Sequence, residues 1–217
     1  MIRRIRERMR QRRALTAYAA GDFERAGALF RAMLKAHPET RGIRHNLALT
    51  CIALEQYEEA EEMLLTELDW YGEYYPRLRV LADLYYVTGR REAAHEFYRR
   101  TLASEVPDHD RLVIEKRVEL TASEQSFALV AEAHAAFSRG NSLMANEDWA
   151  AAVREFEHAA SLDVTNIHAL NNAGTVYLNN LDQPDRAVEL FRQALRWSKL
   201  PWIGRNLKQA VAACSQT

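Results

Sequence analysis

The residue types that could perform chemistry show no catalytic or metal-binding spacing in this chain. The seven histidines form no HExxH motif, and no glycine-rich phosphate-binding loop is present. The tightest cluster of metal-ligand types is Asp108, His109 and Asp110, which follows a proline in a predicted turn. Such residues in a turn are more typical of a helix terminus than of a cation site. We therefore expect no catalytic residue, no metal and no cofactor.

Charge is the second chemical feature, and it is unevenly distributed. Residues 1–13 hold seven arginines and one glutamate, a net charge of +6, so the remaining residues carry −7 of the total of −1. The arginines of this basic arm are Arg3, Arg4, Arg6, Arg8, Arg10, Arg12 and Arg13. A helical arm would also place Ile2, Ile5 and Met9 on one face. Three interpretations stay open: a first helix with solvated arginines, an acidic partner in another protein or in the same chain, or an anionic membrane surface.

Composition predicts a soluble all-α protein. The chain is 48% hydrophobic and has only eight glycines and five prolines in 217 residues, as expected of helices joined by short turns. Cys51 and Cys214 have no framework or metal-ligand spacing, which favours a reducing compartment. No apolar run has the length of a signal peptide or a membrane span, so we expect a cytoplasmic location. Nucleic acid is not an expected partner, because the body of the chain is acidic.

A period of 34 residues organises the sequence. Small residues recur in pairs, one pair in each unit: Ala14 and Ala26, Ala48 and Ala60, Ala82 and Ala94. Each pair predicts two antiparallel helices that cross closely, since a larger side chain would separate their axes. Units beginning near 7, 41 and 75 follow without interruption, and the pattern resumes near 133 and 167 after an insertion of about 24 residues. Such a period indicates stacked helix pairs that present a long concave surface.

The interruption divides the predicted organisation. The basic arm, residues 1–13, merges into the first helix of an N-terminal sub-stack, residues 7–107, of three units. Residues 108–120 form an inserted linker, of which 111–120 suit a docked helix better than an alternating strand. Thr121 and Glu124 have the spacing of a capping box that would begin a helix. A second sub-stack, residues 121–217, then holds two units and a C-terminal capping helix.

The repeating residues resemble the tetratricopeptide repeat (TPR) family over about 80% of the chain. In the third unit the matching residues are Leu78, Leu81, Ala82, Tyr85, Gly89, Ala94, Tyr98 and Pro107. The departures include Glu67, where the family has a small residue. The resemblance implies a right-handed solenoid of about five helix-turn-helix units plus a C-terminal capping helix. It also implies that the first helices of the pairs line a groove that binds an extended or helical peptide.

The resemblance nominates residues for this groove. Chaperone-binding members of the family hold a C-terminal carboxylate with two Lys, two Asn and one Arg, of which Asn141, Asn172 and Arg205 match while Phe137 and Pro201 occupy the lysine positions. An anion held by amide N–H groups and a guanidinium is physically reasonable, although weak without the lysines. The alternative is that these asparagines hydrogen-bond to the backbone of a bound or neighbouring segment and recognise no terminal carboxylate. The full predicted groove is Asn141, Asn171, Asn172, Asn179 and Arg205, with Asn46, Arg79 and Tyr86 in the N-terminal half.

The function expected from these features is recognition without catalysis. The leading hypothesis is an adaptor, scaffold or assembly factor that binds a partner peptide or protein in the groove. Two alternatives remain: a scaffold recruited to a membrane surface by the basic arm, and a homo-oligomer built by stacking between molecules.

Overall fold

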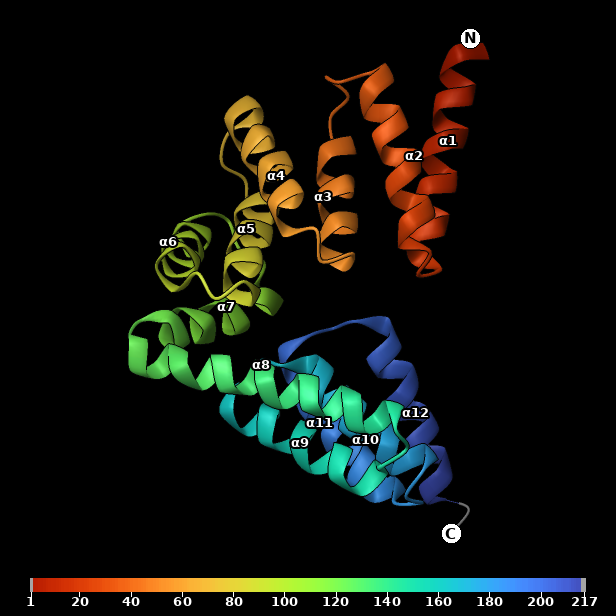
Figure 1. The fold of residues 1–217 in the computed structure, drawn as a ribbon, viewed down its shortest axis with the longest axis vertical. Coiled ribbons are helices and arrows are strands. Elements are labelled where there is room, and N and C mark those ends of the chain that lie inside the picture. Colours follow the sequence, from red (N-terminus) through yellow and green to blue (C-terminus); the bar gives the residue numbers. More distant parts are fainter. Residues whose placement is uncertain (1, 216–217) are drawn as a thin grey trace. The chain divides into compact units, whose positions relative to one another are not determined.

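The structure is a computed structural model that describes residues 2–215, with side chains from residue 7 onward. Over these residues the chain forms twelve α-helices and no strand, which confirms the predicted all-α class (Figure 1). The helices form two compact units, Met1–Ser104 and Glu105–Thr217, which we call unit 1 and unit 2. None of the helices in residues 2–215 has the length and apolar content needed to cross a membrane.

Unit 1 contains three antiparallel helix pairs. Its helices are α1 (Ile2–Ala19), α2 (Phe23–Ala36), α3 (Ile43–Ala53), α4 (Tyr57–Tyr71), α5 (Tyr75–Val87) and α6 (Arg91–Leu102). Each of these helices packs on the next one along the chain, from α1 on α2 to α5 on α6. The six small residues that the period predicted at the crossings are all buried: Ala14, Ala26, Ala48, Ala60, Ala82 and Ala94.

The turns within the helix pairs each use one residue of left-handed backbone conformation. In the first and third pairs this residue is Gly21 (φ 79°) or Gly89 (φ 76°). The other pairs place Glu55 (φ 58°), Glu147 (φ 61°) and Asp182 (φ 51°) there. Because a Cβ atom disfavours this conformation, the last three turns carry a cost that glycine would avoid.

Glu67, the departure from the repeat pattern, is buried in unit 1 with polar partners. Its side chain is 3% exposed, and one carboxylate oxygen accepts a hydrogen bond from the Gly42 N–H at 3.3 Å. The other oxygen lies 3.6 Å from Arg77 Nε and 3.7 Å from His45 Nδ1. A buried carboxylate needs such partners, so a polar cluster takes the place of the small residue that this position usually holds.

Unit 2 begins with an added helix and continues with two pairs and a final helix. Its helices are α7 (Asp108–Thr121), α8 (Glu124–Ala145), α9 (Trp149–Leu162), α10 (Ile167–Asn179), α11 (Pro184–Trp197) and α12 (Pro201–Cys214). Helix α7 confirms the helical interpretation of 111–120; it buries Val113, Ile114 and Leu120 and packs on α8 and α11.

The predicted capping box at Thr121 and Glu124 is wrong. Helix α8 begins at Glu124, but its N-cap is Ser123, whose hydroxyl accepts from the Ser126 N–H at 3.1 Å while Ser126 Oγ accepts from the Ser123 N–H at 3.3 Å. Thr121 instead ends α7, where its buried hydroxyl donates to the Arg117 carbonyl at 2.7 Å. A reciprocal cap therefore forms two residues later than predicted and uses a serine in place of the glutamate.

Candidate functional site

The first helices of the pairs in unit 2, together with the final helix, carry four asparagines in similar positions. Helix α8 contributes Asn141, α10 contributes Asn171 and Asn172, and α12 contributes Asn206. We call these four asparagines the amide surface.

Glycines hold α8 and α10 close to the second helices of their pairs. A Cβ atom at Gly140 would lie 2.6 Å from the Phe156 ring, and one at Gly174 would lie 2.8 Å from the Phe191 ring. Both distances are shorter than carbon atoms in contact allow. The two glycines therefore fix how closely the helices that carry the amide surface approach α9 and α11.

Hydrogen bonds join the amides across neighbouring helices. Asn172 Nδ2 donates to Asn141 Oδ1 at 3.2 Å, which links α10 to α8, and Asn206 Nδ2 donates to Asn171 Oδ1 at 2.8 Å, which links α12 to α10. All four residues are half-buried. In the described part of the chain no buried side-chain nitrogen or oxygen lacks a hydrogen-bond partner, so the amide atoms not used in these pairs face solvent.

The two pairs therefore fix the side chains without using their full capacity. Each amide has two N–H donors and a carbonyl oxygen that can accept twice, and each pair uses only one donor and one acceptor position. What remains is a set of oriented donors and acceptors on adjacent helices. Such groups can bond to an extended peptide backbone, which presents N–H and C=O groups in alternation.

Cationic and aromatic groups flank the amide surface. Arg205 is exposed on α12 and makes no ion pair within residues 7–215, and Asn179 is exposed at the end of α10. The ring of His168 stacks on Trp202 with centroids 6.0 Å apart and an interplanar angle of 24°. Arg117 of α7 donates from Nε to Thr165 Oγ1 at 3.2 Å.

Helix α7 also affects a histidine of α8. Burial lowers the pKa of His134, the Asp163 carboxylate opposes this shift, and the Arg117 guanidinium lowers the pKa further. The neutral imidazole is therefore favoured in the folded protein.

The structure brings together part of the predicted groove. Asn141 contacts Asn172, and Asn171 lies beside Asn172 on α10 with its partner on α12. Sequence reasoning missed that partner, Asn206. The signal was present, because Asn206 follows Asn171 by 35 residues, close to the period of the repeat.

The residues predicted for the groove in unit 1 have different surroundings. Arg79 donates from Nη1 to the Tyr75 hydroxyl at 2.7 Å and lies 3.7 Å from Asp83, so its charge is used within α5. Tyr86 is 2% exposed and packs edge-on against Tyr98 in the core. Asn46 is half-buried on α3. Of these three residues, Tyr86 is therefore buried and Arg79 already has partners on its own helix.

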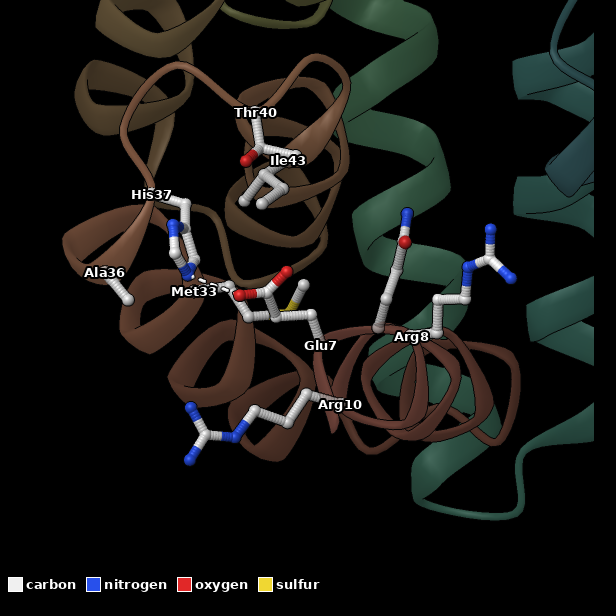
Figure 2. A pocket seen from close by; sticks show the side chains of 9 residues that line it. Glu7, Arg8, Arg10, Met33, Ala36, His37, Thr40 and Ile43 are labelled. Atoms are coloured by element: carbon white, nitrogen blue, oxygen red, sulfur yellow. Dashed lines mark ion pairs between the residues drawn. The ribbon is translucent and has the colours of Figure 1, made fainter. Parts of the chain in front are cut away.

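The basic arm forms the first turns of α1, which packs on α2. The side chains of Arg3, Arg4 and Arg6 lie outside the described residues, whereas those of Arg8, Arg10, Arg12 and Arg13 are exposed. Glu7 points inward and lies 2.8 Å from His37 Nε2 across a cavity of about 170 Å³, while Arg8 and Arg10 point away from each other (Figure 2). The ion pair fixes α1 to the end of α2, and Met33 and Ile43 line the same cavity.

The cluster of metal-ligand types after Pro107 has an ordinary helical role. Asp108, His109 and Asp110 form the first turn of α7. The carboxylates of Asp108 and Asp110 there interact favourably with the positive end of the helix dipole. Over residues 2–215 the structure places no group of three or more His, Cys, Asp or Glu side chains in an arrangement that could hold a metal ion.

Comparison with known proteins places two segments of the chain in one repeat family. Residues 17–71 and 167–199 match models described as tetratricopeptide repeat. Comparison with curated protein sequences gives no match.

Solved structures of TPR proteins resemble the chain at low sequence identity. The Cut9–Hcn1 hetero-tetramer of the APC/C matches with a TM-score of 0.52 at 14% identity, over 94% of this chain and 43% of that chain. A thermophilic TPR protein from Thermus thermophilus matches with a TM-score of 0.43 at 20% identity, over 95% and 99% of the two chains. YrrB, a TPR protein with an unusual peptide-binding site, matches with a TM-score of 0.46 at 16% identity, over 95% and 90%.

The family rests on three observations that agree. The sequence repeats with a period of 34 residues, the small residues of each repeat are buried where paired helices cross, and two separate segments match models of the same repeat. The chain is therefore a protein of the tetratricopeptide repeat family.

Proposed function

We propose that this protein is a non-catalytic interaction scaffold and that unit 2 binds an extended peptide segment of a partner across α8, α10 and α12. The observation that carries the proposal is the pairing of Asn141 with Asn172 and of Asn171 with Asn206. The pairs hold four amides in fixed orientations while part of each amide faces solvent. A peptide that lies across the three helices meets donors and acceptors already oriented, which lowers the entropic cost of binding.

The charge distribution of unit 2 supports this choice of surface. Helices α10 and α12 contain no Asp or Glu, and α12 supplies Arg205 and Lys208. The acidic groups of the helix pairs lie on α8, α9 and α11. Two of those on α9 are paired, since Glu155 is 2.9 Å from Arg139 and Glu157 is 2.8 Å from Arg186. No carboxylate of α10 or α12 therefore repels a peptide carbonyl or an acidic side chain on the amide surface.

An internal segment of the partner fits this surface better than a C-terminal carboxylate. The two positions at which carboxylate-binding relatives carry lysine are Phe137, which packs on Phe156 at 5.7 Å, and Pro201, which begins α12. Neither position supplies a cation. Recognition would then rest on the amides and on Arg205, with the stacked His168 and Trp202 as a platform for an apolar or aromatic side chain.

Peptide selection followed by mutagenesis tests the proposal. A random peptide library is selected on the full chain, and the affinity of a selected peptide is measured by isothermal titration for the wild type and for Asn141→Ala, Asn172→Ala and Arg205→Ala, singly and combined. One hydrogen bond contributes about 0.5–1.5 kcal/mol, so each single change should weaken binding about two- to tenfold and the triple change should do so by more. Thermal unfolding followed by circular dichroism establishes that the variants are folded.

Two control variants make the result specific. Asn180→Ala changes an exposed asparagine just after α10, and Asn46→Ala changes the predicted groove residue of unit 1. Both should bind the peptide as the wild type does. If the folded triple variant keeps the affinity of the wild type for every selected peptide, the amide surface is not the binding site and the proposal is wrong.

A further inference from the structure

The outer side of helix α1 carries a line of exposed residues that the helix does not use for its own packing. Arg8, Arg12, Leu15 and Ala19 are all exposed, and Leu15 is 43% exposed. Their spacing of four, three and four residues places them on one line along a helix, over about 16 Å at 1.5 Å per residue. We call these four residues the basic face.

Helix α4 carries a line with the same spacing and the opposite charge. Glu58, Glu62, Leu65 and Asp69 are all exposed, and Leu65 is 40% exposed. The helix has no Lys or Arg at any of its 15 positions. We call these four residues the acidic face. In both faces two like charges, one turn apart, are followed by a leucine three residues later.

Neither face is neutralised within the chain. The neighbouring carboxylates of α4 do have partners, since Glu59 lies 2.6 Å from Arg31 and Glu61 lies 2.8 Å from Arg90. By contrast, among residues 7–215 no ion pair forms at the charged residues of the two faces, which are Arg8, Arg12, Glu58, Glu62 and Asp69. The acidic residues on one side of α4 thus form ion pairs within the chain, whereas those of the acidic face form none among residues 7–215.

The two faces cannot meet in one molecule. Helices α2 and α3 lie between α1 and α4 in unit 1, and each packs on its neighbours in chain order (Figure 1). The faces can meet only between two copies. When a second α1 is aligned parallel to α4, Arg8 falls beside Glu58, and Arg12 falls beside Glu62. Leu15 then falls beside Leu65.

We propose that this protein associates with itself by packing the basic face of one copy on the acidic face of another. The contact is heterologous, because each copy offers one face of each kind, so copies join head to tail and form open chains unless the rotation closes a ring. Opposite charges set the register and speed the encounter, and the paired leucines exclude water at the centre of the contact.

An anionic lipid surface fits the basic face less well. A helix that lies on a membrane needs a continuous apolar side, whereas the basic face has a single large apolar residue, Leu15, between Arg12 and Ala19. The other exposed large apolar residue of α1, Met9, lies off this line. The matching spacing of the acidic face, on the same chain, points to a second copy as the occupant.

Charge reversal on the full chain tests the contact. Variant R8E/R12E reverses the basic face and variant E58R/E62R reverses the acidic face. The control R154E/R196E reverses two exposed arginines of unit 2 and changes the net charge as much as R8E/R12E does. Sedimentation velocity over a concentration series, at low and high NaCl, gives the mass distribution of each protein and of an equal mixture of the two reversed variants.

We expect the wild type and the control to form dimers and larger species at low salt and to return to monomers at high salt, because exposed ion pairs are screened. Each reversed variant alone brings together two faces of like charge, so its association should weaken at least tenfold. Their mixture should regain a hetero-complex, because the reversed faces of the two variants have opposite charges.

Two outcomes overturn the proposal. The first is a wild type that stays monomeric throughout, and the second is a mixture of the reversed variants that regains no complex. If the wild type is monomeric but sediments with phosphatidylserine vesicles and R8E/R12E does not, the basic face binds lipid, and self-association is wrong.

Discussion

Replacement of Gly140 by alanine tests whether the close crossing of α8 and α9 is as tight as the structure shows. A Cβ atom at this position would lie 2.6 Å from Phe156 Cε1 and 2.7 Å from Phe156 Cδ1, whereas carbon atoms in contact are normally about 3.5–4.0 Å apart. The Phe156 ring is fully buried. The helices must therefore separate by about 1 Å or the ring must leave its preferred rotamer.

The magnitude follows from two opposing effects. Overpacking of a buried site costs about 1–3 kcal/mol, and alanine gains about 1 kcal/mol over glycine in a helix interior. Gly140→Ala should lower the free energy of unfolding by about 1 kcal/mol. Gly204 of α12 has no atom within 4 Å of the corresponding Cβ position, so Gly204→Ala should raise the free energy of unfolding by up to about 1 kcal/mol.

Urea unfolding followed by tryptophan fluorescence measures both effects in unit 2. Trp70 is the single tryptophan of unit 1, so a Trp70→Phe background confines the signal to Trp149, Trp197 and Trp202. With an m value of about 2 kcal/mol/M, a change of about 1 kcal/mol moves the midpoint by about 0.5 M. If Gly140→Ala stabilises unit 2 as much as Gly204→Ala does, the crossing has space for a methyl group and the reasoning is wrong.

Three further changes test local features. Ser123→Ala removes the N-cap of α8 and should lower the free energy of unfolding by about 1 kcal/mol in the same urea assay. Glu147→Gly relieves a left-handed backbone conformation and should raise the melting temperature, because the cost removed is about 1 kcal/mol. Burial lowers the pKa of His45 while Glu67 opposes the shift, so the folded state favours the neutral imidazole. The stability that His45 contributes is therefore complete above its unfolded pKa of about 6.5 and is lost as pH falls through the lower folded pKa. His45→Gln should reduce the dependence of melting temperature on pH between about 7 and 5, with a part remaining because burial also lowers the pKa of His134 and of His168. An unchanged dependence would exclude a contribution from His45.

The sequence predicted the helix pairs well, because their determinants are local and periodic. The small residues at the crossings, such as Ala48 and Ala82, recur at the repeat period and must be small for a reason that holds in every unit. The ends of helices were harder to predict. Thr121 and Ser123 are both good N-cap residues, and only the length of α7 decides that Thr121 ends one helix and Ser123 begins the next.

The side chains of the candidate site depended on packing that no local pattern specifies. Tyr86 lies on a first helix, as predicted for a groove residue, but its ring turns into the core beside Tyr98. Glu67 stands where a small residue was expected, and its buried carboxylate is satisfied by groups of α3 and α5 and by the backbone before α3. In each case another element supplies the partner, so the environment became known only once the helices were placed.

The two proposed surfaces lie on different helices, so one proposal can be wrong while the other is right. The amide surface consists of neutral groups on α8, α10 and α12 of unit 2, whereas the basic and acidic faces consist mainly of charged groups on α1 and α4 of unit 1. R8E/R12E should therefore bind a selected peptide with the affinity of the wild type, and the variant with Asn141, Asn172 and Arg205 changed to alanine should still self-associate. If both surfaces act in one protein, each assembled copy presents its own peptide site, and a partner with several copies of the segment would bind an assembly more tightly than it binds a single chain. The affinity for a single peptide would then be the same for R8E/R12E, which does not assemble, as for the wild type, while the affinity for a multivalent partner would fall.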